Sequence, residues 1–275
     1  MGNVQQTLQE GLAKGLFRRY ALMGLAKTNL LSRRFVYDWA LVERPHYAFG
    51  LLRSAVEARI LGYRQLTAIE FGVAGGNGLL AMEKYAAEIS QLVGIDIQVV
   101  GFDSGAGLPT LSDYRDLPYL WAPGDFAMDV ASLESRLQSA TLRLGPISET
   151  LPTFLEELGA NAPIGFVAVD VDLWSSTRDC LELFDADPLT RLPRVWCYFD
   201  DIVETIPEVG ELLAIREFND AHESIKIRQP FNLRRNIPLQ PVWAEQMWQA
   251  HSFHHPAYTQ LIVSSPNREL PLEPE

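Results

Sequence analysis

The hydrophobic pattern of the chain changes near residue 62. Up to that point, from about residue 4, apolar residues recur three and four positions apart, which predicts helices with breaks near Asn29 and at Pro45. Beyond it, short apolar runs alternate with segments of helical periodicity. This alternation predicts an α/β protein with a doubly wound sheet. In such sheets a ligand binds beyond the carboxyl ends of the strands.

Seven apolar runs are expected to form strands. They lie at 66–73, 97–103, 140–145, within 165–174 and 195–202, at 225–231 and at 258–265. The helices expected between them lie at 77–90, 129–138, 149–158, 176–184 and 207–224. We therefore predict an N-terminal helical arm or lid at 1–62, a sheet domain at 63–265 and a disordered tail at 266–275.

Two of the predicted strands end in pairs of carboxylates. Asp170 and Asp172 follow one apolar run, and Asp200 and Asp201 follow the next. Residues two apart on a strand project to the same face, so Asp170 and Asp172 are expected to lie side by side. Two carboxylates about 4 Å apart repel by roughly 4 kcal/mol at an effective dielectric constant near 20. Protonation, a basic partner or a metal ion would offset this repulsion.

Neither of these runs contains a Lys or Arg, which favours a hard cation such as Mg²⁺ over a basic partner. The alternative is structural, because a single Asp at such a position more often caps the helix that follows. Four acids at the ends of two strands reverse that preference.

A glycine-rich loop joins the first predicted strand to its helix. It begins at Glu70 and runs through Gly72, Gly76 and Gly78, so that backbone N–H groups and a helix N-terminus can bind an anionic ligand. The spacing is not that of the dinucleotide motif G-x-G-x-x-G. Asp103 ends the second strand, where an acid can accept hydrogen bonds from ribose hydroxyls. A nucleoside ligand is the expectation; the structural alternative is a tight turn with Asp103 as a helix cap.

Composition and charge limit the classes of partner that the protein is expected to bind. The net charge of −12 disfavours a nucleic-acid surface, and no apolar stretch reaches the length of a membrane span. The first 40 residues are basic, which predicts an arm that lies against the acidic body or a second subunit, so a homodimer is an expectation, with contact to a membrane surface the alternative. Cys180 and Cys197 are expected to be buried thiols, and no secretory signal pattern opens the chain, so we expect a cytoplasmic protein.

The order of the motifs resembles that of class I S-adenosylmethionine-dependent methyltransferases. It is most similar to the macrocin O-methyltransferase family, cation-dependent enzymes that methylate sugar hydroxyls. The resemblance covers about 45–225 and is carried by E-x-G-x-x-x-G-x-G at 70–78, GFDSGAGLP at 101–109, GPISETLPTF at 145–154, VDVDLWSSTRDCLELF at 169–184 and YFDDI at 198–202. It implies a Rossmann-like seven-stranded sheet of order 3-2-1-4-5-7-6, in which strands four and five are neighbours. This chain departs from the family at Trp174, where a Tyr is usual, and by lacking a bulky acidic pair before GLP.

The resemblance also implies a role for each candidate residue. The methionine end of S-adenosyl-L-methionine would be lined by Glu70, Gly72, Gly76 and Gly78. The ribose would bind Asp103, and the adenine would lie beside Gly145 and Ile147. Mg²⁺ would be held by Asp170, Asp200 and Asp201, with Asp172 as general base. The implied activity is O-methylation of a small hydroxylated acceptor, a sugar or another natural-product hydroxyl.

Two functions remain as alternatives: a non-catalytic protein that binds the nucleoside, and a nucleotide-dependent oxidoreductase. Aromatic residues in the long segment 104–128 are expected either to form a lid over the acceptor or to pack beneath it; they are Tyr114, Tyr119 and Trp121. The segment 226–257 does not resemble the family closely and is expected to help shape the acceptor pocket. It carries two groups of charged or polar side chains, expected to be solvated loop charges (Arg228, Arg234, Arg235) and a surface cluster near the acceptor entrance rather than a second metal site (His251, His254, His255).

Overall fold

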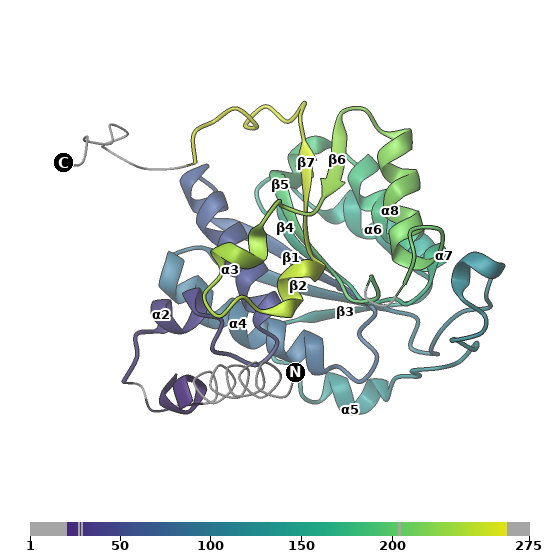
Figure 1. Cartoon of the computed structure of the whole chain (residues 1–275), viewed down its shortest axis with the longest axis horizontal. Helices are drawn as coiled ribbons and strands as arrows, with labels where there is room; N and C mark the ends of the chain where they lie inside the picture. Colours follow the sequence, from purple (N-terminus) through teal and green to yellow (C-terminus); the bar gives the residue numbers. More distant parts are fainter. Residues whose placement is uncertain (1–20, 27, 29, 203–204, 263–275) are drawn as a thin grey trace, which may run out of the picture.

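A seven-stranded sheet between two layers of helices forms the body of the protein (Figure 1). The computed structural model describes residues 21–26, 28, 30–202 and 205–262. Its strands are β1 (Gln65–Phe71), β2 (Asp96–Asp103), β3 (Thr141–Leu144), β4 (Ile164–Val169), β5 (Arg191–Phe199), β6 (Ile225–Arg228) and β7 (Met247–Ser252). Their order is β3-β2-β1-β4-β5-β7-β6, with β7 antiparallel to both of its neighbours. The predicted doubly wound sheet and its strand order are confirmed.

The helices divide between the two faces of the sheet. One face carries α3 (Pro45–Ile60) and α4 (Asn77–Val93), and the other carries α6 (Ile147–Glu157), α7 (Trp174–Leu181) and α8 (Gly210–Ala221) (Figure 1). The shorter helices are α2 (Arg33–Asp38), α5 (Val130–Glu134), α9 (Leu233–Asn236), η1 (Tyr114–Asp116), η2 (Glu182–Asp185), η3 (Pro188–Thr190) and η4 (Val242–Gln246). Among the described helices, none is both long enough and apolar enough to cross a membrane.

Two hydrophobic cores, one on each face of the sheet, hold in place the strands whose carboxyl ends carry the carboxylates. In β1, Leu66 and Ala68 point into the core under α3 and α4, whereas Ile69 and Phe71 point into the core under α6 and α7. All six residues of β4 are buried, as expected of a parallel strand covered on both sides. Burying one large apolar side chain contributes about 1.5–3 kcal/mol, so the strand ends are held on a rigid frame.

The last strand does not lie where the sequence pattern predicts it. The prediction at 258–265 is wrong, since residues 256–259 form turns and 263–265 lie outside the described residues. The strand is instead β7, which forms because it pairs with β5 on one side and β6 on the other.

The predicted helical arm is described only in part. Residues 1–20 and the predicted tail at 266–275 lie outside the described residues. Residues 21–26 are helical, and α3 packs against β4 and β5 with Tyr47, Leu51 and Ala55 buried. The domain boundary at residue 62 stays a prediction, but α3 contributes directly to the core of the sheet.

Candidate active site

The glycine-rich loop after β1 is shaped by two close approaches. Gly72 has a positive φ of 81°, and a Cβ atom there would stand 1.7 Å from the backbone oxygen of Asp170. At Gly78, in the first turn of α4, a Cβ would stand 1.8 Å from Oε1 of Glu70. Only glycine leaves room at these positions, so Gly72 packs directly against the end of β4 and Gly78 against Glu70 on β1.

Glu70 is a buried carboxylate with one free oxygen. The hydroxyl of Tyr47 donates to its Oε1 at 2.6 Å, while its Oε2 has no hydrogen-bond partner. Burial raises the pKa of Glu70 to about 8. A buried polar oxygen without a partner costs free energy, and a positively charged donor of a ligand would favour the ionised form of Glu70, in which Oε2 accepts a hydrogen bond.

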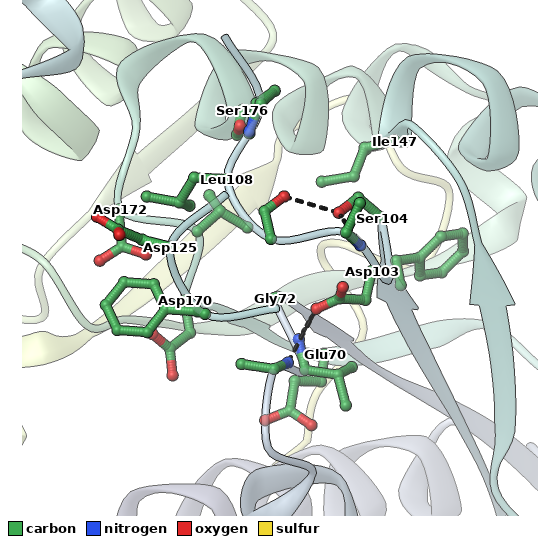
Figure 2. Close-up of a pocket in the computed structure, with 18 of the residues that line it drawn as sticks. Glu70, Gly72, Asp103, Ser104, Leu108, Asp125, Ile147, Asp170, Asp172 and Ser176 are labelled. Carbon is green, nitrogen blue, oxygen red and sulfur yellow. Dashed lines mark hydrogen bonds between the residues drawn. The ribbon is translucent and has the colours of Figure 1, made fainter. Parts of the chain in front are cut away.

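Asp103 fastens the glycine-rich loop to the end of β2. Its Oδ2 accepts from the backbone N–H groups of Val73 and Ala74, both at 2.9 Å (Figure 2). Its Oδ1 accepts from the backbone N–H of Gly105 at 2.7 Å. Asp103 therefore shapes the loop and is not a helix cap. A carboxylate has about four acceptor positions, so these three bonds leave capacity for a ligand hydroxyl.

A single cavity of about 740 Å³ brings the predicted site residues together. Its volume is within the usual range for a small-molecule site. All eleven predicted residues line it: Glu70, Gly72, Gly76, Gly78, Asp103, Gly145, Ile147, Asp170, Asp172, Asp200 and Asp201. In Figure 2, Asp103 and Ile147 stand on one side of the cavity and Asp170 and Asp172 on the other.

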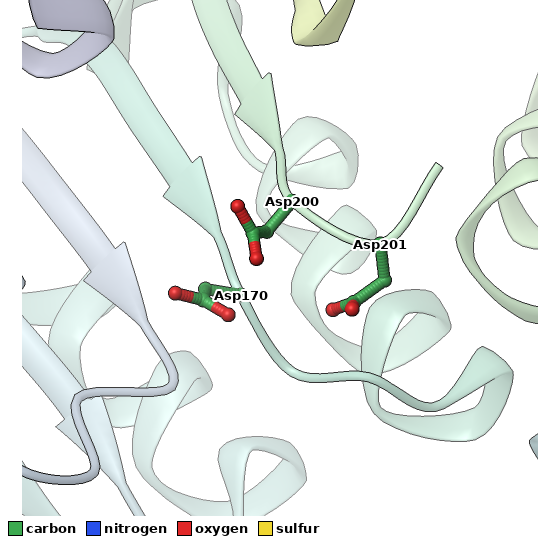
Figure 3. Close-up of side chains that lie close together, drawn as sticks. All are labelled: Asp170, Asp200 and Asp201. Carbon is green, nitrogen blue, oxygen red and sulfur yellow. The ribbon is translucent and has the colours of Figure 1, made fainter. Parts of the chain in front are cut away.

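Three of the predicted carboxylates converge at the ends of β4 and β5. Asp170, Asp200 and Asp201 each offer one oxygen, and these oxygens all lie within 4.8 Å of one another (Figure 3). Burial and the neighbouring carboxylates raise the pKa values of Asp170 and Asp201 to about 7. A set of partly buried carboxylate oxygens matches the ligands that Mg²⁺ and Ca²⁺ prefer. The donor set therefore fits a hard divalent cation.

Asp172 stands beside this group but not for the reason given by strand alternation. β4 ends at Val169, and Asp172 adopts a left-handed backbone conformation with φ of 62°. The prediction that Asp170 and Asp172 share a strand face is therefore wrong. The backbone N–H of Asp172 donates to Oδ2 of Asp201 at 3.2 Å. Burial, followed by the charges of Asp170 and Asp200, raises the pKa of Asp172 to about 7.

Three residues that the sequence did not single out hold the carboxylates in place. The hydroxyl of Tyr198 donates to Oδ1 of Asp200, and Nε2 of Gln246 donates to the backbone oxygen of Asp200 at 2.8 Å. Glu211, fully buried at the start of α8, accepts from the backbone N–H of Asp201 at 2.9 Å. Gln246 belongs to the segment 226–257, so this poorly matched region reaches the site from the far side of β5.

Several residues of the segment 104–128 line the cavity, and a hydrogen bond holds the segment against α7. Buried Asp116 accepts from the backbone N–H of Ser175 at 2.8 Å, which ties the segment to the start of α7. Trp121 lines the cavity, and its role as part of a lid over the acceptor stays a prediction. Tyr114 and Tyr119 are 68% and 78% exposed, so neither packs beneath the segment.

The predicted place of the histidine cluster is wrong. β7 runs antiparallel to β5, pairing Met247 with Tyr198 at the carboxylate end and His251 with Arg194 at the opposite end. His251 lies at the end of β7 away from the cavity, and His254 and His255 follow that end. Nδ1 of His251 lies 2.9 Å from the hydroxyl of Tyr258. In the part of the chain that the structure describes, the group suited to a metal is the three-aspartate group.

Gly78→Ala is expected to destabilise the protein by disrupting the packing around Glu70. The new Cβ would displace the Glu70 carboxylate, breaking its bond from Tyr47, with a loss of about 1–3 kcal/mol in the free energy of unfolding. Urea unfolding measures this loss. Gly159→Ala offers the contrast, because a Cβ at Gly159 meets nothing within 4 Å and the residue has no positive φ. A Gly78→Ala protein as stable as the wild type would contradict the packing described.

Comparison with known proteins gives structural matches alone. No protein-family model matches the sequence, and no curated protein does. Similar solved structures include CalS11, a calicheamicin methyltransferase (21% identity over 75% of this chain and 84% of that one, TM-score 0.47). The apo structure of CalS11, described as a TDP-rhamnose 3'-O-methyltransferase of calicheamicin biosynthesis, matches at 19% identity over the same shares, with a TM-score of 0.40. The O-methyltransferase TomG from Streptomyces achromogenes, involved in tomaymycin synthesis and in complex with SAM, matches at 13% identity over 76% of this chain and 79% of that one, with a TM-score of 0.38.

Proposed function

We propose that this protein is an S-adenosylmethionine-dependent, divalent-cation-assisted O-methyltransferase that acts on a small hydroxylated acceptor. One observation carries the proposal: the same cavity is bounded by a glycine-rich loop closed by Asp103 and by a group of three convergent carboxylates. The first feature suits a nucleoside with a charged tail, and the second suits a cation that binds oxygen. Cation-assisted methyl transfer to a hydroxyl needs the donor and the cation within one site, so that the acceptor oxygen can be aligned with the methyl group.

Three groups of cavity-lining residues are assigned to three parts of the donor molecule. The methionine end is assigned to Glu70, Gly72, Gly76 and Gly78, the ribose to Asp103, and the adenine to Gly145 and Ile147. S-adenosylmethionine supplies a methyl group already activated on sulfonium sulfur. The protein's task is then to align the acceptor oxygen with that methyl group, which can lower the barrier by roughly 7–11 kcal/mol.

The aspartates on the opposite side of the cavity are assigned to the ionisation of the acceptor hydroxyl. Asp170, Asp200 and Asp201 would hold Mg²⁺, which supplies positive charge that makes an acceptor hydroxyl easier to ionise. Tyr198 and Gln246 orient Asp200 through the hydrogen bonds described above. Asp172 receives the proton of the acceptor hydroxyl at its carboxylate. A carboxylate positioned beside the acceptor hydroxyl can act as a general base.

Isothermal titration with S-adenosylhomocysteine, and separately with NADH, tests the donor assignment. We expect binding of S-adenosylhomocysteine, and Mg²⁺-dependent methyl transfer from S-adenosylmethionine to members of a panel of hydroxylated acceptors that includes free sugars, glycosides and phenols. Preference for NADH would favour the oxidoreductase. Donor binding without turnover on any acceptor would favour the non-catalytic binding protein.

The affinity for Mg²⁺ is expected to fall as the pH drops below about 7. Asp170 and Asp201 keep their protons up to about that pH, and the cation must displace them. The loss approaches tenfold per pH unit for each proton displaced. Titration calorimetry at pH 5.5 and pH 8, in two buffers of different ionisation enthalpy, measures both affinity and protons released. Equal affinities with no proton release would argue against binding at these carboxylates.

A further inference from the structure

Arg44 brings an isolated positive charge into an acidic cavity. Among the described residues that line the cavity, it is the one with a basic side chain, and eight of the others carry carboxylates. No described carboxylate oxygen lies within 4.0 Å of its guanidinium nitrogens. A cation that several acids surround, and none pairs with, remains available to a ligand.

The position of Arg44 is at the glycine-loop end of the cavity. It directly precedes α3, and its guanidinium carbon lies 5.7 Å from the centre of the Tyr47 ring. The hydroxyl of Tyr47 in turn donates to Glu70 at 2.6 Å. The positive charge of Arg44 acts on both Glu70 and Asp170, lowering their pKa values against the larger effect of burial. The positive charge of Arg44 therefore acts on both the glycine-rich-loop end of the cavity and the three-aspartate group.

Glu70 places an unpartnered acceptor at the same end of the cavity. Glu70 lines the cavity and is only 1% exposed, and its buried Oε2 has no hydrogen-bond partner. The Tyr47 proton is already donated to Oε1, so Tyr47 cannot satisfy Oε2 as well. This end of the cavity thus offers one unpaired guanidinium and one unpartnered carboxylate oxygen. A ligand group complementary to both carries a carboxylate and an ammonium on neighbouring atoms, as an α-amino acid does.

We propose that Arg44 binds the α-carboxylate of the methionine end of the donor, while Oε2 of Glu70 accepts a hydrogen bond from its α-ammonium. The inference rests on the proposed function and adds a residue and a specificity to it. Arg44 selects donors with an intact amino-acid end and discriminates against nucleosides that lack the carboxylate. The planar fork of Arg suits two hydrogen bonds to one carboxylate, which a Lys cannot reproduce.

A comparison of two donors tests the inference without relying on turnover. Titration calorimetry with S-adenosylmethionine and with decarboxylated S-adenosylmethionine is carried out on the wild type, Arg44→Gln and Arg44→Lys. The wild type is expected to bind the decarboxylated compound about tenfold to a hundredfold more weakly. Arg44→Gln loses the same factor for S-adenosylmethionine alone, and so binds the two compounds alike. Arg44→Lys retains part of the preference.

A control variant separates this role from a structural one. Arg53→Gln removes an exposed Arg on α3 that does not line the cavity, and it should leave both affinities unchanged. If Arg44→Gln weakens both compounds alike, Arg44 only supports the fold, and the inference fails while the proposed function stands. The inference fails in the same way if the wild type binds both compounds equally. If the wild type binds neither, the proposed function fails and the inference falls with it.

Discussion

Asp170→Asn is expected to stabilise the cation-free protein at pH 8 and to abolish its stabilisation by Mg²⁺. Burial, with Asp200 and Asp201 nearby, raises the folded-state pKa of Asp170 from 3.8 to about 7. The folded protein thus binds more protons than the unfolded chain between these pH values, and its stability falls as the pH rises from about 4 to about 7. Ionised Asp170 costs at most about 4 kcal/mol by this shift, and an uncharged amide should recover on the order of 2 kcal/mol.

Urea unfolding at pH 5 and pH 8, with EDTA or with Mg²⁺, measures these effects. The wild type should be less stable at pH 8 than at pH 5 in EDTA, and Mg²⁺ should restore the difference at pH 8. Asp220→Asn, which removes an exposed carboxylate on α8, should change neither behaviour. An Asp170→Asn protein that is less stable than the wild type in EDTA at pH 8, and still stabilised by Mg²⁺, would contradict the cation site.

Asp172→Asn is expected to lower kcat for methyl transfer by about 10²- to 10⁴-fold, the usual contribution of a general base. The affinities for donor and Mg²⁺ should change by no more than a few-fold, because Asp172 lies outside the three-aspartate group. Asn is the suitable replacement, since it tolerates the left-handed backbone at this position better than Ala does. Single-turnover kinetics and titration calorimetry measure the two quantities separately.

Asp179→Asn is the matched control for Asp172. Asp179 lines the same cavity, but it has no assigned part in the reaction. We expect its kcat to remain within a few-fold of the wild-type value. If Asp172→Asn turns over at the wild-type rate, or if Asp179→Asn loses as much activity, another group accepts the proton.

The parallel half of the sheet could be predicted because its residues obey one constraint. β1, β4 and most of β5 are buried on both faces, and burial on both faces requires continuous apolar runs such as Ile164–Val169. Site residues that lie at the carboxyl ends of parallel strands could then be expected at one end of the sheet. The neighbouring positions of β4 and β5 were implied by the family resemblance. This is why residues as distant as Glu70 and Asp201 could be expected in one cavity.

The last strand escaped prediction because its stability is not local. Met247–Ser252 includes Gln249 and His251 and has no β-branched residue, so its pattern does not favour a strand. It becomes a strand because β5 and β6 both offer it hydrogen-bonding partners. The run at 258–265 is rich in residues with high strand propensity, and it was therefore predicted as the strand when propensity alone was considered.

The residues that orient the candidate ligands also escaped prediction. Tyr198 and Gln246 contact Asp200, and Glu211 contacts Asp201, but hydrogen bonds between distant residues leave no periodic signal. Asp172 shows a related limit. Strand alternation applies only while the chain remains a strand, and β4 ends three residues before Asp172.

The position of β7 links the completion of the fold to the completion of the site. β6 is made before β7 during synthesis, yet in the described sheet β6 pairs with β7 and not with β5. A nascent chain that has not yet released residues 247–252 from the ribosome therefore has an open edge at β5, where unpaired backbone groups invite association with other chains. Gln246, which orients Asp200, immediately precedes the same strand. The contact that holds Asp200 thus forms only after β7, the last strand in the described residues, has been synthesised and inserted.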